Sequence, residues 1–152
     1  MHERLKKIYF TLLTPAVFGF TGVYLLRRCL QPLEMPDELM TFVAQAIFML
    51  AVLCALAGPI FYRSLFAHRQ RFLSGVSRTV FLKFECRLIT MVLVTPYLAL
   101  AGYFLQLPRL HLAATLLMAL YAVYYYYPSQ KRISFDMKVF RAGYMLSMDR
   151  MH

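Results

Sequence analysis

Long uninterrupted runs of apolar residues dominate the chain and set its predicted architecture. They fall at Ile8–Leu26, about Leu39–Tyr62, Leu88–Leu107 and Leu110–Tyr127. An α-helix rises ~1.5 Å per residue, so about twenty residues cross a hydrocarbon core of ~30 Å. A helix also pairs its backbone amides within one segment, which lipid requires. The pattern therefore predicts an all-α integral membrane protein with four transmembrane helices.

Composition supports lipid as the solvent. Of the 152 residues, 61% are hydrophobic, against roughly 45–50% for soluble domains, and a short soluble chain could not bury that excess. We expect residues 1–152 to form one transmembrane domain, with 128–152 as a cytoplasmic tail. The net charge of +10 does not indicate nucleic-acid binding, because the cations flank apolar runs and form no separate basic domain.

The cations predict the orientation, because Lys and Arg concentrate on the cytoplasmic side. Of the 17 Lys and Arg residues, all but Arg27, Arg28 and Arg109 fall on one side of the four runs. We therefore expect both termini in the cytoplasm, most simply at a bacterial inner membrane. The Tyr124–Tyr127 run at the cytoplasmic end of the fourth run agrees, since tyrosines gather at membrane interfaces.

A basic helical hairpin is expected between the second and third runs. No helix breaker follows Tyr62 until about Leu73–Ser77, and Ser77 is a suitable N-cap for the next helix. The hairpin and the tail carry cations that we expect to contact anionic lipid headgroups or partner subunits. These are Arg63, Arg69, Arg71, Arg78, Lys83, Arg87, Lys131, Arg132, Lys138 and Arg141.

The tail supports two interpretations. Ile133, Phe135, Met137 and Val139 alternate with polar residues, which is typical of a strand that could pair with a neighbour's sheet edge. Ile133 and Met137 also share a helical face with Phe140 and Tyr144. We favour a short helix at the membrane surface.

Few polar features lie inside the apolar runs. Gln45 is the one strongly polar side chain of the second run, and we expect it to bond to a neighbouring helix. Pro15, Pro59 and Pro96 each remove a backbone donor and should kink their helices. Thr14 and Thr95 stand beside two of these positions and could help satisfy the freed carbonyls.

The sequence gives no sign of a catalytic or cofactor site. No ionisable residue occupies the middle of a run, although proton relays and ion-coupled carriers usually need one. His2, His68, His111 and His152 lie at ends or in loops, whereas a haem bundle needs axial histidines within its spans. We expect no cofactor, no metal and no enzymatic activity, and no small-molecule substrate can be identified.

Three functions remain open. The favoured hypothesis is a non-catalytic small subunit that scaffolds or anchors a larger membrane complex. In layout the chain is similar to the four-helix small subunits of tripartite substrate-transport systems. That similarity rests on layout and not on a motif, since Pro36-Asp37-Glu38 is very short, and it implies a subunit of a transport complex. The alternatives are a homo-oligomeric transporter or pore, with Pro59, Pro96 and Gln45 near its path, and an interfacial lipid-modifying enzyme.

Overall fold

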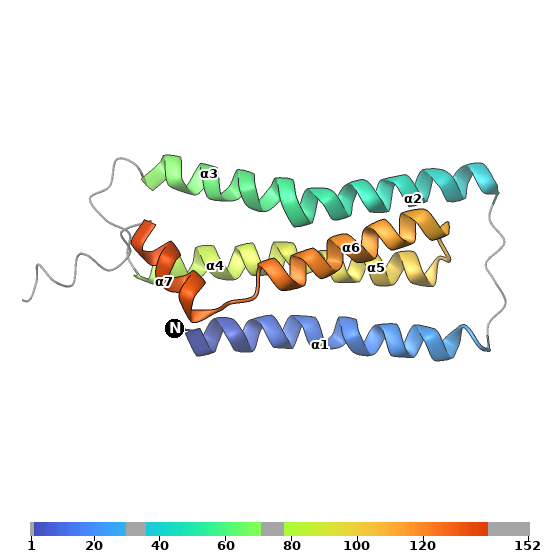
Figure 1. Ribbon diagram of the computed structural model, residues 1–152, viewed down its shortest axis with the longest axis horizontal. Coiled ribbons are helices and arrows are strands. Elements are labelled where there is room, and N and C mark those ends of the chain that lie inside the picture. Colours follow the sequence, from blue (N-terminus) through green and yellow to red (C-terminus); the bar gives the residue numbers. More distant parts are fainter. Residues whose placement is uncertain (1, 30–35, 71–77, 140–152) are drawn as a thin grey trace, which may run out of the picture.

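The computed structural model describes residues 2–29, 36–70 and 78–139, and all regular structure in these ranges is helical. The helices form four roughly antiparallel rods (Figure 1). The first rod is α1 (His2–Leu26), and the second joins α2 (Asp37–Val52), η1 (Leu53–Ala57) and α3 (Gly58–Gln70). The third joins α4 (Arg78–Val92) and α5 (Val94–Phe104), and the fourth is α6 (Arg109–Tyr125). A short helix, α7 (Gln130–Val139), follows it.

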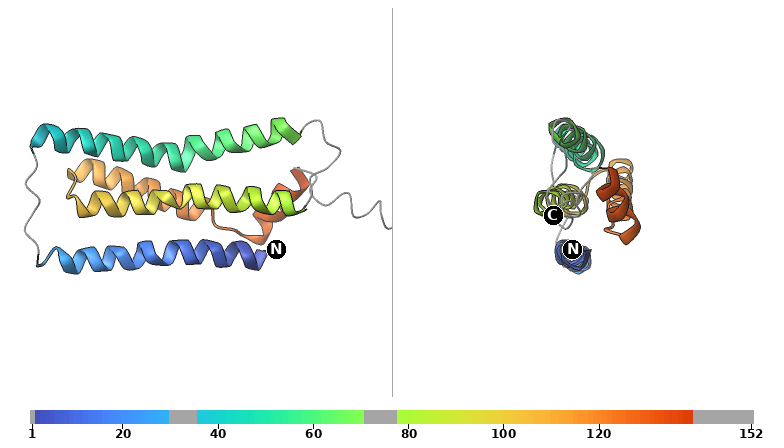
Figure 2. Two further views of the ribbon diagram at one scale, coloured as in Figure 1. Left: turned by 180° about the vertical axis from the view of Figure 1, so that it is seen from behind. Right: turned by 90° about the vertical axis from the view of Figure 1, so that its left-hand side faces the viewer.

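The rods are arranged around a central pair. The α4–α5 rod and α6 lie in the middle, with α1 on one side and the α2–α3 rod on the other (Figure 2). Two hydrogen bonds attach α1 to this pair: the Tyr9 hydroxyl donates to the Val123 carbonyl at 2.7 Å, and the Tyr97 hydroxyl donates to the Leu12 carbonyl at 2.5 Å. In both bonds the acceptor is a backbone carbonyl oxygen. The bonds therefore fix the position of α1 along the axes of its neighbours.

Glycines permit the closest helix contacts. A Cβ built on Gly58 would lie 2.1 Å from the Met91 methyl carbon and 3.0 Å from the Leu53 carbonyl oxygen. A Cβ on Gly19 would lie 2.5 Å from a methyl of Leu100, whereas Gly22 has nothing within 4 Å. The α3–α4 contact and the α1–α5 contact therefore depend on single missing side chains, as is common between membrane helices.

The three prolines have different effects on their helices. α1 continues through Pro15, and the Thr14 hydroxyl donates to the Phe10 carbonyl at 2.7 Å. Directly before Pro59, η1 is a π-helical turn in which the Gly58 amide bonds to the Leu53 carbonyl. The second rod bends at this point (Figure 1). The third rod breaks at Leu93, three residues before Pro96, and the Thr95 hydroxyl is buried without a hydrogen-bond partner among the described residues.

A tight turn joins α5 to α6. The Gln106 and Leu107 amides bond back to the carbonyls of Tyr103 and Gly102, at 3.3 and 3.1 Å. Gln106 has a φ of 59°, which is the left-handed conformation that this type of helix C-terminus requires. Pro108 then precedes the first residue of α6. The turn is short, so α5 and α6 pack side by side.

The helices have the length and hydropathy of membrane spans. Three qualify, at Glu3–Leu26, Asp37–Arg69 and Thr79–Phe104, and a fourth qualifies if α6 and α7, bent by 72°, are counted as one span. By itself α6 has 17 residues, a rise of roughly 26 Å. The outer faces of the rods are apolar, with Phe18, Phe42, Phe61, Leu110 and Leu117 each more than half exposed. The all-α prediction is thus confirmed for the described residues, and the apolar surface is compatible with lipid.

Candidate functional site

The ion pairs of the described residues all lie at one end of the bundle, where α3 ends, α4 begins and α7 lies (Figure 1). Ser129 is the N-cap of α7 and fixes where the helix begins. Ser129 accepts the Arg132 amide at its hydroxyl, 3.2 Å away, and the Ile133 amide at its carbonyl, 3.1 Å away. The α6 helix ends just before, at Tyr125, and the chain turns by 72° into α7.

Four charged side chains hold α7 against α3 and α4. The Arg63 guanidinium of α3 donates to the Asp136 carboxylate of α7. Arg132, one turn before Asp136 in α7, lies 3.7 Å from the same carboxylate and 3.8 Å from the Glu85 carboxylate of α4. The side chains of Asp136 and Glu85 are only 7% and 3% exposed. This charge cluster of two arginines and two carboxylates is formally neutral, which is the condition under which such groups tolerate burial.

Arg132 has two further contacts that fix its position. Its guanidinium lies over the Tyr126 ring, 4.9 Å from the ring centre, and donates to the Tyr125 carbonyl at 3.3 Å. Both tyrosines belong to the end of α6. Arg132 therefore connects the C-terminal end of α6, the buried carboxylate of α4 and its own helix, and so contributes to holding the bend between α6 and α7.

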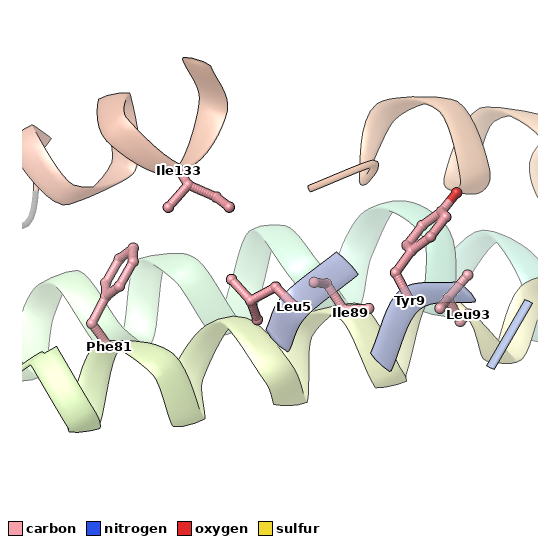
Figure 3. Close-up of a cluster of buried hydrophobic side chains, with 6 residues drawn as sticks. All are labelled: Leu5, Tyr9, Phe81, Ile89, Leu93 and Ile133. Atoms are coloured by element: carbon pink, nitrogen blue, oxygen red, sulfur yellow. The ribbon is translucent and has the colours of Figure 1, made fainter. Parts of the chain in front are cut away.

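An apolar contact completes the docking of α7. Ile133 lies in a cluster with Leu5 and Tyr9 of α1 and Phe81 and Ile89 of α4 (Figure 3). Met137 packs against the same cluster. Residues 130–139 form the helix that we favoured, and Ile133 and Met137 both contact this cluster from one face of it. Phe140 and Tyr144 lie outside the described residues.

A basic pocket opens beside the charge cluster, between α3 and α4. Its volume is about 310 Å³, and its lining consists of Tyr62, Phe66, Arg69, Val80, Lys83, Phe84 and Arg87. The helix period explains the lining. Tyr62, Phe66 and Arg69 recur on one face of α3, and Val80, Lys83, Phe84 and Arg87 recur on one face of α4.

Aromatic stacking forms the apolar wall of this pocket. The Phe84 ring lies 4.1 Å from that of Phe66 and 5.1 Å from that of Tyr62, measured between ring centres, and both pairs are stacked. The cations Arg69, Lys83 and Arg87 are exposed, and none forms an ion pair within the described part of the chain. The pocket therefore combines an aromatic wall with three unneutralised positive charges.

The predicted contact cations thus separate into groups. Arg63 and Arg132 are used inside the molecule, while Arg69, Lys83 and Arg87 surround the pocket. Lys131 is exposed on α7. Arg78 begins α4 and Lys138 lies in the last turn of α7, whereas Arg71, Ser77 and Arg141 lie outside the described residues.

Gln45 has an unexpected position. Its side chain is exposed on α2, and it forms no hydrogen bond with the residues that the structure describes. The neighbouring Thr41 hydroxyl, by contrast, donates to the Asp37 carbonyl of its own helix at 2.9 Å. The expected bond from Gln45 to another helix of the same bundle is not present in the described residues.

Sequence reasoning missed Glu85 and Asp136. One local signal existed, since Arg132 and Asp136 are four residues apart and would be neighbours on any helix. The pairings with α3 and α4 had no local signal, because they join distant parts of the chain. No group of three or more His, Cys, Asp or Glu side chains suited to a metal occurs in the described ranges.

Comparisons with known proteins add no family. Neither a protein-family model, nor a curated protein, nor a solved structure matches the chain.

Proposed function

We propose that the protein is a non-catalytic small membrane subunit that scaffolds or anchors a larger membrane complex, with a transport system as one such complex. The observation that carries this proposal is the outward position of Gln45. An amide facing hydrocarbon has no water to bind, so it favours a helix from another chain that offers a donor and an acceptor. A subunit contact over the exposed face of α2 would provide both.

The proposed topology places this contact within the bilayer. Four spans cross the membrane, the fourth being α6, with both ends of the chain in the cytoplasm of a bacterium and the α3–α4 hairpin on the same side. The antiparallel rods and the concentration of cations at the α7 end support this arrangement. Gln45 then lies about 9–10 Å into the second span from Leu39, judged from the rise per residue.

The docked α7 supports a scaffolding role. Its charge cluster and apolar contacts attach it to α1, α3 and α4. A preorganised surface loses less conformational entropy when it binds than a mobile one. The cytoplasmic end is therefore suited to positioning a larger protein against the membrane.

Co-purification tests the proposal. The chain is purified in mild detergent from its native membrane, and mass spectrometry identifies what accompanies it. Gln45→Leu should reduce recovery of the partner about three- to twentyfold, as expected for the loss of one interhelical hydrogen bond of ~0.6–1.7 kcal/mol. Thr41→Val is the matched control, because this hydroxyl is already satisfied within α2.

The outcomes separate the candidate functions. A different protein lost in Gln45→Leu but retained in Thr41→Val supports the subunit. A homo-oligomer that dissociates in Gln45→Leu transfers support to the transporter or pore alternative, which flux measurements in liposomes would then examine. A stable lone monomer for the unmodified chain overturns the proposal.

A further inference from the structure

The basic pocket between α3 and α4 has no place in the contact through α2, and its chemistry points to a ligand of its own. The two sites share no helix, since Gln45 belongs to α2 and the pocket lies between α3 and α4. Each can therefore be tested without disturbing the other.

The distribution of charge favours an anion. The two carboxylates of the charge cluster are already engaged, Asp136 by Arg63 and Arg132 and Glu85 by Arg132. Among the described residues no carboxylate lines the pocket, and its three cations have no ion-pair partner. Two of them are arginines, whose planar guanidinium groups match the oxygens of a phosphate in pairs.

The walls favour an amphiphilic ligand over a free ion. Tyr62, Phe66 and Phe84 give the pocket an apolar side. Elsewhere on α3 the apolar side chains of Ile60, Phe61 and Leu65 are 64%, 69% and 52% exposed. They extend the apolar surface of α3 toward the membrane. A phospholipid has this combination, with a phosphate at one end and acyl chains that cover an apolar flank.

We propose that this pocket binds the phosphate of an anionic phospholipid, with Arg69 and Arg87 as the principal phosphate contacts and Lys83 as an additional charge. In the proposed topology the pocket opens toward the cytoplasmic leaflet, where anionic lipids are concentrated. The bound lipid then lies between two helices of the hairpin and joins α3 to α4 outside the charge cluster.

Native mass spectrometry and thermal unfolding test the proposal on the full chain. The protein is titrated in mild detergent with phosphatidylglycerol, phosphatidylcholine or inorganic phosphate. Of the three ligands, we expect only phosphatidylglycerol to remain bound and to raise the midpoint of thermal unfolding. The triple variant Arg69→Gln, Lys83→Gln, Arg87→Gln should weaken its binding roughly tenfold or more, given the attraction of each cation for an anionic headgroup.

Two variants control for charge and for folding. The matched control Arg27→Gln, Arg28→Gln, Arg109→Gln removes the same charge from the other end of the bundle and should bind phosphatidylglycerol normally. Val80→Phe keeps every cation but fills the pocket, and it should also weaken binding. This second variant keeps the test decisive if the triple variant fails to fold.

The other outcomes overturn the proposal. Equal binding of phosphatidylcholine would show that the anionic charge is not recognised. Equal stabilisation by inorganic phosphate would identify a site for a free anion. The triple variant and its charge-matched control could lose the same amount of lipid binding, or Val80→Phe could bind normally. Either result would show that the overall charge of the protein, and not the pocket, attracts the lipid.

Discussion

Arg63 of α3 donates a hydrogen bond to Asp136 of α7, and so joins two residues that are 73 positions apart in the sequence. Asp136 is also 3.7 Å from Arg132, so a single carboxylate neutralises cations from two helices. Both helices lie at the end of the bundle that we assign to the cytoplasm (Figure 1). The bond between Arg63 and Asp136 therefore attaches α7 directly to α3.

Asp136→Asn should release α7. The substitution leaves Arg63 and Arg132 without their shared counter-charge, and we expect a loss of about 1–3 kcal/mol in the free energy of unfolding. Limited trypsin digestion in detergent measures the release, because Lys131 and Arg132 become more accessible when α7 detaches. Ser134→Ala on the exposed side of α7 is the control. Equal cleavage rates in the two variants would show that the ion pair does not hold the helix.

Glu85→Gln should cost less than Asp136→Asn, although Glu85 is more deeply buried. Its carboxylate lies 3.8 Å from Arg132, and its Oε1 atom has no hydrogen-bond partner among the described residues. Arg132 retains Asp136 as a counter-charge after the change, so no buried cation is left unpaired and the expected loss is smaller than for Asp136→Asn. Thermal unfolding of both variants in one detergent compares them. The reverse order would mean that Glu85 is the principal anchor of Arg132.

Gly58→Leu should destabilise the contact between α3 and α4. The new side chain begins where a Cβ already meets Met91 and the Leu53 carbonyl, and overpacking of this kind costs about 1–3 kcal/mol. Gly22→Leu is the matched control, because no atom lies within 4 Å of its Cβ position. The thermal midpoint and the yield of folded protein provide the measurement. A similar decrease in both variants would attribute the effect to the added bulk alone.

The exposed Cys29 tests the proposed orientation directly. A membrane-impermeant maleimide should label it in intact cells, since Cys29 follows α1 at the end assigned to the outside. In a Cys29→Ser background, Arg69→Cys should be labelled only after the membrane is permeabilised. Labelling of the second variant in intact cells would reverse the topology.

The sequence predicted the helices better than it predicted the contacts between them. The apolar runs located the rods, because hydrocarbon length and backbone pairing constrain each run independently of its neighbours. Pro59 follows the π-helical turn η1, and Pro96 lies three residues after the break at Leu93. Pro15, by contrast, is accommodated within α1. The dual pattern of residues 130–139 favoured a helix without excluding a strand, and the segment is a helix that packs on Phe81 and Leu5.

The candidate site was predictable only as a region. A count of cations treats Arg63 and Arg69 alike, although one is paired inside the molecule and the other surrounds the pocket. The difference depends on which carboxylate lies opposite, and that is a property of the packed helices. The exposure of Gln45 was equally unpredictable from the sequence. Whether its side chain is covered depends on which face of α2 the rest of the bundle packs against.

The π-helical turn η1 also determines which face of α3 points toward α4. Ala51, Ala55 and Pro59 are all buried at a spacing of four residues, and in a regular helix each such step drifts by about 40°. The surplus residue in η1 absorbs this drift, so Tyr62 and Phe66 still meet Phe84. Removing one residue there would turn α3 by about 100°. The length of this segment, more than its composition, therefore keeps the two halves of the molecule in register.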